Sequence, residues 1–131
     1  MSVSKILVVD DDFLILDTVG LILNSEGYIV DLLPYGEKIF ENIADFFPDL
    51  IIMDVMLGTV DGMVLYNLIK STGSLADIPI IMITASDAMI GILKESFSPD
   101  DFIQKPFSIE TLINKVRLKL GENKASDAAE S

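Results

Sequence analysis

The sequence contains no cysteine, no histidine and no tryptophan. Without cysteine the chain has no disulfide and no thiolate metal site. Without histidine it has neither a Ser-His-Asp or Cys-His catalytic arrangement nor a zinc site with imidazole ligands. Positive charge is also scarce, because 9 Lys and Arg oppose 21 Asp and Glu and the formal net charge is −12. Such a surface repels nucleic-acid phosphates and favours cations or basic partners, so direct binding of nucleic acid is not expected.

Long uninterrupted hydrophobic runs are missing as well, although 50% of the residues are hydrophobic. Acidic residues, asparagine or lysine interrupt each run before it reaches the roughly 18 residues that a membrane-spanning helix needs. The apolar run near the N-terminus is also too short for a signal peptide. A chain of 131 residues with this composition predicts one soluble cytoplasmic domain, with a hydrophobic core and no insertion into a membrane.

What the chain does contain is a regular alternation of short apolar runs and amphipathic segments. The runs predict strands at residues 5–10, 28–33, 49–54, 78–85 and 101–104, and the amphipathic segments predict helices at 13–26, 39–47, 62–71, 87–96 and 108–120. This alternation predicts an α/β fold with a doubly wound, five-stranded parallel sheet. We expect the domain to occupy residues 4–120, followed by a polar tail at 121–131 that is frayed or begins a linker.

Polar side chains gather where the predicted strands end. Asp10 and Asp11 follow the first strand, and Asp54 ends the third. Thr84 ends the fourth strand and Lys105 follows the fifth. Ligands of open parallel sheets bind beyond the carboxyl ends of the strands, where the strand order reverses. The order 2-1-3-4-5 brings these carboxylates together, whereas 3-2-1-4-5 would isolate Asp54, so the acids favour 2-1-3-4-5.

Converging carboxylates need a compensating charge. Two of them about 5 Å apart repel by on the order of 3 kcal/mol at an effective dielectric near 20. Hard oxygen ligands without sulfur or imidazole suit Mg²⁺, and Mn²⁺ or Ca²⁺ less specifically. Lys105 adds a compact positive charge and Thr84 a hydroxyl donor. Together these groups are suited to hold a phosphoryl group beside a carboxylate.

Four segments, taken together in this order, carry a specific resemblance. They are "ILVVDDD", "DLIIMDVMLGTVDG", "PIIMITAS" and "DDFIQKPF". The chain resembles the receiver domain of two-component response regulators, including chemotaxis receivers, over about residues 4–120. The resemblance implies a flavodoxin-like (βα)5 fold and a role as a phosphoprotein in phosphorelay signal transduction.

The resemblance also implies a metal site. Asp11 would bind Mg²⁺ directly, Asp10 would hold it largely through water, and Asp54 would contribute a carboxylate oxygen. The backbone carbonyl of Met56 would be a further ligand. Asp12, the third acid of the run, is interpreted as the cap of the first helix.

By the same resemblance, Asp54 would accept a phosphoryl group from a sensor histidine kinase or a histidine phosphotransfer protein. Thr84 would hydrogen-bond a phosphoryl oxygen and Lys105 would pair with the phosphoryl group. Thr84 and the aromatic residue Phe102 would then move, and this movement would alter the face made by the fourth helix, fifth strand and fifth helix. A downstream output protein or domain would recognise that face.

Several positions depart from the family pattern. Met56 stands where asparagine, lysine or arginine is frequent, so the phosphoryl lifetime is open. Gly58 replaces a common proline and is expected to loosen its loop. Phe102 stands where tyrosine is common, and without a hydroxyl its outward state should be less favourable. The Lys105-Pro106 bond is a candidate cis peptide.

Other readings remain open at this point. A phosphohydrolase of the haloacid dehalogenase type would share the aspartyl phosphate and Mg²⁺, but it needs a second aspartate two residues after the nucleophile, where Met56 stands. An unphosphorylated interaction module with the same fold is the third possibility. The expectation is a signalling receiver that is not an enzyme, beyond assisting its own phosphorylation and dephosphorylation. Asp61 and Asp87 are interpreted as turn or cap residues.

Overall fold

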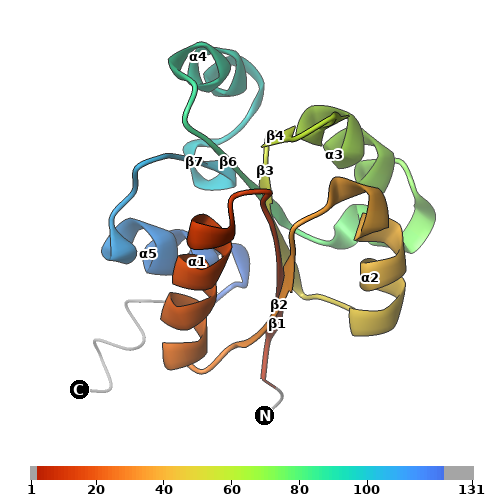
Figure 1. Cartoon of the computed structure of the whole chain (residues 1–131), viewed down its shortest axis with the longest axis vertical. Coiled ribbons are helices and arrows are strands. Elements are labelled where there is room, and N and C mark those ends of the chain that lie inside the picture. The colour runs from red at the N-terminus through yellow and green to blue at the C-terminus, as the bar shows by residue number, and fades with distance from the viewer. Residues whose placement is uncertain (1–2, 123–131) are drawn as a thin grey trace.

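The computed structural model describes residues 3–122 and shows a parallel sheet with helices on both faces (Figure 1). The strands are β1 (Lys5–Val9), β2 (Ile29–Leu33), β3 (Leu50–Asp54), β6 (Ile80–Thr84) and β7 (Phe102–Gln104). Their order in the sheet is β2-β1-β3-β6-β7, and each pair of neighbours is parallel. The predicted α/β class and the strand order 2-1-3-4-5 are therefore confirmed.

Two hydrophobic cores lie on opposite faces of this sheet. The helices are α1 (Phe13–Ser25), α2 (Ile39–Phe46), α3 (Gly62–Lys70), α4 (Asp87–Ser96) and α5 (Ile109–Lys119). Buried residues of α1 and α5 form one core, and those of α2, α3 and α4 form the other. Because both faces are covered, β3 and β6 are buried at every residue, which explains their uninterrupted apolar sequences.

Polar side chains fix the helix starts. The Asp12 carboxylate accepts hydrogen bonds from the amides of Leu14 and Ile15, so its predicted role as the cap of α1 is confirmed. Asp61 caps α3 in the same way. At α4 the cap is Ser86, and Asp87 instead accepts a hydrogen bond from Gln104 in β7.

The second predicted helix, over 39–47, differs in its end and in its faces. α2 ends at Phe46, because Phe47 adopts a left-handed backbone conformation. The apolar positions that predicted this amphipathic helix are Ile39, Phe40, Ile43 and Phe47. Of these, Ile39 and Ile43 are buried, but Phe40 is 37% exposed and Phe47 is 73% exposed. The two phenylalanines lie beside the buried stripe of α2 rather than within it.

The loop after β3 is a hairpin that was not predicted from the sequence. β4 (Met56–Leu57) and β5 (Val60–Asp61) pair antiparallel around the two residues 58–59. Gly58 has a φ of +65°, which proline cannot adopt and which suits the first position of a tight hairpin turn. The glycine permits a closed turn, and the expectation that Gly58 loosens this loop stays a prediction.

Three short 3₁₀ helices within residues 3–122 were also not predicted. They are η1 (Gly36–Lys38), η2 (Gly73–Asp77) and η3 (Pro99–Asp101). The Lys105-Pro106 peptide is cis, as the resemblance implied. Within residues 3–122, no helix has the length and apolar character required to cross a membrane. Most of the predicted tail, residues 123–131, lies outside the described residues, so the domain boundaries stay a prediction.

Candidate functional site

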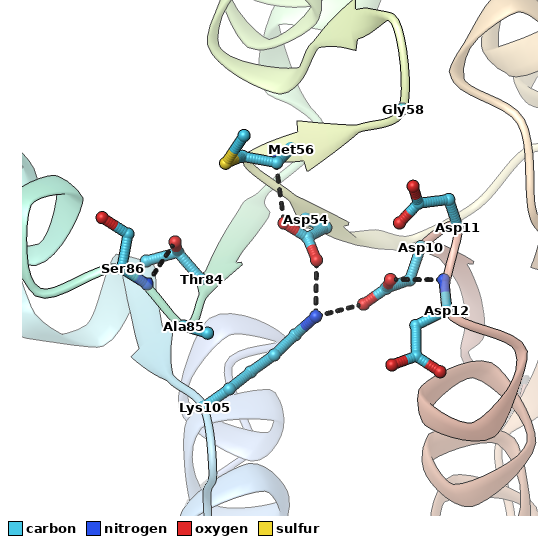
Figure 2. Close-up of a pocket in the computed structure, with 10 residues that line it drawn as sticks. All are labelled: Asp10, Asp11, Asp12, Asp54, Met56, Gly58, Thr84, Ala85, Ser86 and Lys105. Carbon is cyan, nitrogen blue, oxygen red and sulfur yellow. Dashed lines mark hydrogen bonds and ion pairs between the residues drawn. The ribbon is translucent and has the colours of Figure 1, made fainter.

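The polar residues predicted to meet do line one pocket at the carboxyl ends of the strands (Figure 2). Its volume is about 550 Å³, and its walls come from Asp10, Asp11, Asp12, Asp54, Met56, Gly58, Thr84, Ala85, Ser86 and Lys105. Most of these residues end or follow β1, β3, β6 and β7, which are consecutive in the observed strand order. The pocket therefore lies at the reversal point, as ligand sites of this sheet type do.

Three carboxylates form the acidic part of the pocket. Asp10, Asp11 and Asp54 each offer an oxygen, and these oxygens all lie within 4.8 Å of one another. Asp10 is fully buried and Asp54 is 7% exposed, whereas Asp11 is open to solvent. Two of the three negative charges are thus held away from water, where an uncompensated charge is costly.

Lys105 connects the two buried carboxylates. Its Nζ lies 2.8 Å from Asp10 Oδ2 and 2.5 Å from Asp54 Oδ2. Figure 2 shows the ammonium between the two carboxylates, with Asp11 outside this bridge. Burial opposes the charged form of Lys105, but the hydrogen bonds and charges of both aspartates outweigh it and raise the pKa of the lysine.

Asp10 has the most strongly perturbed environment. Burial raises the pKa of its carboxyl from 3.8 to about 6, and the nearby charge of Asp54 acts in the same direction. The Lys105 ammonium and the Asp12 amide, which donates to Asp10 Oδ1 at 2.9 Å, favour the charged form but do not cancel the burial. A carboxylate so placed gains from a further cation.

The backbone around Asp54 fixes the direction of its side chain. Its Oδ1 accepts a hydrogen bond of 2.7 Å from the Met56 amide, so its Oδ2 faces Lys105. Gly62 packs against the same turn, because its amide donates to the Val55 carbonyl at 2.7 Å. A Cβ at Gly62 would lie 2.3 Å from the Asp54 carbonyl oxygen, so only glycine fits there. The sequence reading gave Gly62 no such role, and the Asp-Gly pair at 61–62 was the available signal.

Thr84 lies across the pocket and is 1% exposed. Its Oγ1 accepts a hydrogen bond of 3.1 Å from the Ser86 amide, and its carbonyl accepts one of 2.8 Å from the Lys105 amide. Among residues 3–122, no acceptor takes the Thr84 hydroxyl proton, so the hydroxyl can donate to a ligand in the pocket. Ser86, which links this turn to α4, was not singled out from the sequence.

The donor set fits a hard divalent cation. Its candidate ligands are the carboxylates of three aspartates, two of them buried, and the chain has no cysteine or histidine to supply a thiolate or an imidazole. Asp10, Asp11 and Asp54 are the three residues that the sequence predicted to meet. Their individual roles, and that of the Met56 carbonyl, stay predictions. The Met56 side chain itself is 64% exposed.

Phe102 lies away from the pocket on the face formed with α4 and α5. Its side chain is turned inward and is 7% exposed. Lys115 of α5 holds it there, because Nζ lies 5.7 Å from the ring centroid and donates to the Phe102 carbonyl at 2.9 Å. The inward state is consistent with the expectation that this phenylalanine disfavours exposure.

Comparisons with known proteins agree with this geometry. The family model described as response regulator receiver domain matches residues 6–117. The response regulator MprA of Mycobacterium tuberculosis H37Rv is 36% identical over 132 residues, which cover 100% of this chain and 56% of that protein. MprA of Mycobacterium leprae is 35% identical, with 97% of this chain and 55% of that protein covered. The chain therefore spans about half the length of the curated relatives it matches.

Solved structures give the same result. A response regulator from Chloroflexus aurantiacus superposes with a TM-score of 0.81 at 29% identity, over 92% of this chain and 100% of that one. The signal receiver domain of a histidine kinase from Syntrophus aciditrophicus gives 0.80 at 30% identity, with 90% of each chain covered. The chemotaxis response regulator CheY4 of Vibrio cholerae, at 24% identity and a TM-score of 0.79 over 90% of this chain and 99% of that one, shares the fold.

Proposed function

Because the chain belongs to the receiver domain family of response regulators, we propose that it accepts a phosphoryl group on Asp54 in two-component signalling. One observation carries this proposal: Lys105 bridges Asp10 and Asp54 at the reversal point of the sheet. This arrangement places a cation beside the buried Asp54 carboxylate. Charge that develops on a transferred phosphoryl group would meet that cation without a large rearrangement.

The transfer is a displacement at phosphorus. Asp54 Oδ2, the oxygen not held by the Met56 amide, attacks the phosphorus of a phosphohistidine. An O–P bond forms and the N–P bond breaks, and the departing imidazole keeps the electron pair and takes up a proton. Lys105 then pairs with a phosphoryl oxygen, and the free Thr84 hydroxyl donates to another.

Asp10, Asp11 and Asp54 would hold Mg²⁺, or Mn²⁺ with the same ligands, together with the Met56 carbonyl. When bound, the ion supplies positive charge that stabilises the transferring phosphoryl group. The raised pKa of Asp10 supports this assignment, because a buried carboxyl of this kind is charged most readily beside a cation.

The phosphodonor would be a sensor histidine kinase or a histidine phosphotransfer protein. Exposed apolar side chains at the start of α1 support docking beside the pocket, since Phe13 is 63% exposed and Leu14 is 73% exposed. The output partner, a protein or a further domain, would recognise the face of α4, β7 and α5 that contains Phe102.

We propose a stoichiometric receiver and not a turnover phosphohydrolase. In the rival class, a second aspartate lies two residues after the nucleophile and acts as acid and base. Met56 occupies that position here and offers Asp54 only its backbone amide. The retained Asp54, Thr84 and Lys105 also argue against a module that is never phosphorylated.

The test is incubation with Mg²⁺ and acetyl phosphate, followed by intact-mass measurement. Wild type should gain one phosphoryl group, Asp54→Ala should gain none, and Asp45→Ala, changed at an exposed acid on α2, should behave as wild type. If wild type gains no mass, or Asp54→Ala gains it equally, the assignment of Asp54 is wrong. Release of phosphate from small phosphoesters in large excess over the protein would instead indicate a phosphohydrolase.

A further inference from the structure

An apolar groove lies at the opposite end of the sheet from the Asp54 pocket. It runs between α2 and η2, near the amino ends of β3 and β6, and has a volume of about 380 Å³. Its walls include Phe40, Ala44 and Phe47 from the α2 side and Leu75 and Ile78 from the η2 side. We call it the α2 groove. The residues that line the groove lie in α2, follow it, or precede β3 and β6, whereas those of the Asp54 pocket end or follow the strands.

The groove exists because α2 and the residue after it carry a second apolar stripe. The first stripe, Ile39 and Ile43, is buried in the core. The second is Phe40, Ala44 and Phe47, spaced i, i+4 and i+7, which places these residues on one side of the helix. All three are exposed, so this stripe has no partner within residues 3–122.

Phe47 is also unfavourable in its backbone. With φ +54° and ψ +64° it adopts the left-handed conformation that glycine usually supplies after a helix. For another residue this conformation costs roughly 1–2 kcal/mol, and it is uncommon for a bulky one. Phe47 is nevertheless 73% exposed, so core packing does not compensate for the strain. A strained and exposed aromatic side chain on the wall of a groove is typical of a contact surface.

The exposed charged side chains next to the groove walls are acidic. Asp45, Asp49 and Asp77 are exposed, and Asp49 itself lines the groove. The neighbouring lysines are turned inward: Lys5 Nζ donates to the Phe46 carbonyl at 3.2 Å, and Lys70 Nζ donates to the Ala76 and Ile78 carbonyls. Both ammonium groups therefore donate to main-chain oxygens, and the exposed side chains at the rim are acidic.

We propose that the α2 groove binds an amphipathic segment of a protein partner, with two or three large apolar side chains flanked by Lys or Arg. The apolar walls of the groove would bind the large apolar side chains of the segment, and the acidic rim would favour Lys or Arg beside them. A second copy of this chain fits poorly, because it would bring the same acidic rim against itself. The groove and Asp54 lie at opposite ends of β3, so binding is separable from phosphorylation.

The test uses two short helical peptides with identical leucines at i, i+4 and i+7. One carries lysines at the remaining positions and the other carries glutamates. In ¹H-¹⁵N spectra, the lysine peptide should shift the amides of Phe40, Ala44 and Phe47 and bind at least tenfold more tightly than the glutamate peptide. Added salt should reduce this preference.

Three variants sharpen the result. Phe47→Ser and Phe40→Ser should each weaken lysine-peptide binding at least tenfold, while both still gain phosphoryl mass from acetyl phosphate. Leu21→Ser, which changes an equally exposed side chain on α1 across the sheet, should bind as wild type. A variant that fails to phosphorylate has lost its fold or its pocket, so the two proposals fail separately.

The proposal is overturned if neither peptide binds at about 1 mM, if both bind equally, or if the shifts lie on α1. It is also overturned if sedimentation shows a wild-type dimer that Phe47→Ser converts to a monomer, because the groove would then hold a second copy of this chain.

Discussion

The two ends of the same sheet differ in the groups with which their lysines interact. At the carboxyl ends, buried carboxylates converge and one lysine, Lys105, bridges two of them. At the amino ends, Lys70 and Lys5 donate to neutral main-chain carbonyls, and the exposed surface is apolar with an acidic rim. The strands β3 and β6, which run between the two ends, are buried throughout.

This difference shows that the unfavourable electrostatic energy of the fold is concentrated at the carboxyl ends of the strands. A lysine that caps neutral carbonyls stabilises its loop modestly, whereas a lysine between two buried carboxylates is needed to keep their charges tolerable. The carboxyl end is therefore built around charge that a ligand can use, and the amino end around surface that a partner can cover.

The strongest test of the comparison removes one lysine at each end. Lys105→Met keeps a side chain of similar length but leaves Asp10 and Asp54 without their cation, and it should lower the free energy of unfolding by about 4 kcal/mol in metal-free buffer. Lys70→Met, the matched control, removes hydrogen bonds to two neutral carbonyls and a contact with the Tyr66 ring at 5.9 Å, and it should cost about 1 kcal/mol. Urea unfolding measures both, and equal losses would show that the two ends do not differ as described.

A second test uses pH. Folding raises the Asp10 pKa from 3.8 to about 6, so the folded chain holds this proton more tightly than the unfolded chain. Its stabilising contribution is therefore present below about pH 4 and is lost as the pH rises through about 6. The shift corresponds to about 3 kcal/mol, at roughly 1.4 kcal/mol per pKa unit.

Asp10→Asn removes this ionisation. In buffer with a chelator, the variant should be more stable than wild type by up to about 3 kcal/mol near pH 7, with the difference vanishing near pH 4. Added Mg²⁺ should stabilise wild type and have little effect on the variant. A difference that is constant across this pH range would mean that burial of the Asp10 charge is not the cause.

The smallest expected effect is at the amino end. Phe47→Gly relieves the left-handed strain, and after the extra freedom of glycine in the unfolded chain is subtracted it should raise the free energy of unfolding by about 0.5 kcal/mol. Phe47→Ala removes the ring but keeps the Cβ, so it should give no such gain. If thermal unfolding shows that Phe47→Ala is more stable than Phe47→Gly, the left-handed conformation of this residue is not a source of strain.

Much of the fold could be predicted because its strands are buried on both faces. Continuous apolar runs such as β3 and β6 are distinctive in the sequence. The placement of the aspartates at strand ends then favoured the strand order 2-1-3-4-5 over 3-2-1-4-5. The pocket residues were predicted for the same reason, since parallel strands bring their carboxyl ends to one edge. Asp12 was assigned correctly because a cap depends on local sequence alone.

The parts that were missed depend on tertiary geometry or on very short elements. The β4–β5 hairpin has strands of two residues, too short for periodicity to detect, although Gly58-Thr59 is a plausible hairpin turn. Phe40 and Phe47 fit a helical period, but the period does not say which of two stripes faces the core. The two contacts of Lys105 depend on side-chain geometry, which spacing along the chain does not give.

The Lys105 bridge also has a consequence for the unphosphorylated protein. The Lys105 ammonium lies against both Asp10 and Asp54 and acts as an internal counter-ion, so we expect the fold to remain stable without bound magnesium. Under the proposed function, a metal ion would enter by exchange against this internal charge, and its apparent affinity would be weaker than three carboxylates without a lysine would give. The ability to accept a phosphoryl group would then depend on the magnesium concentration, whereas the stability of the fold would not.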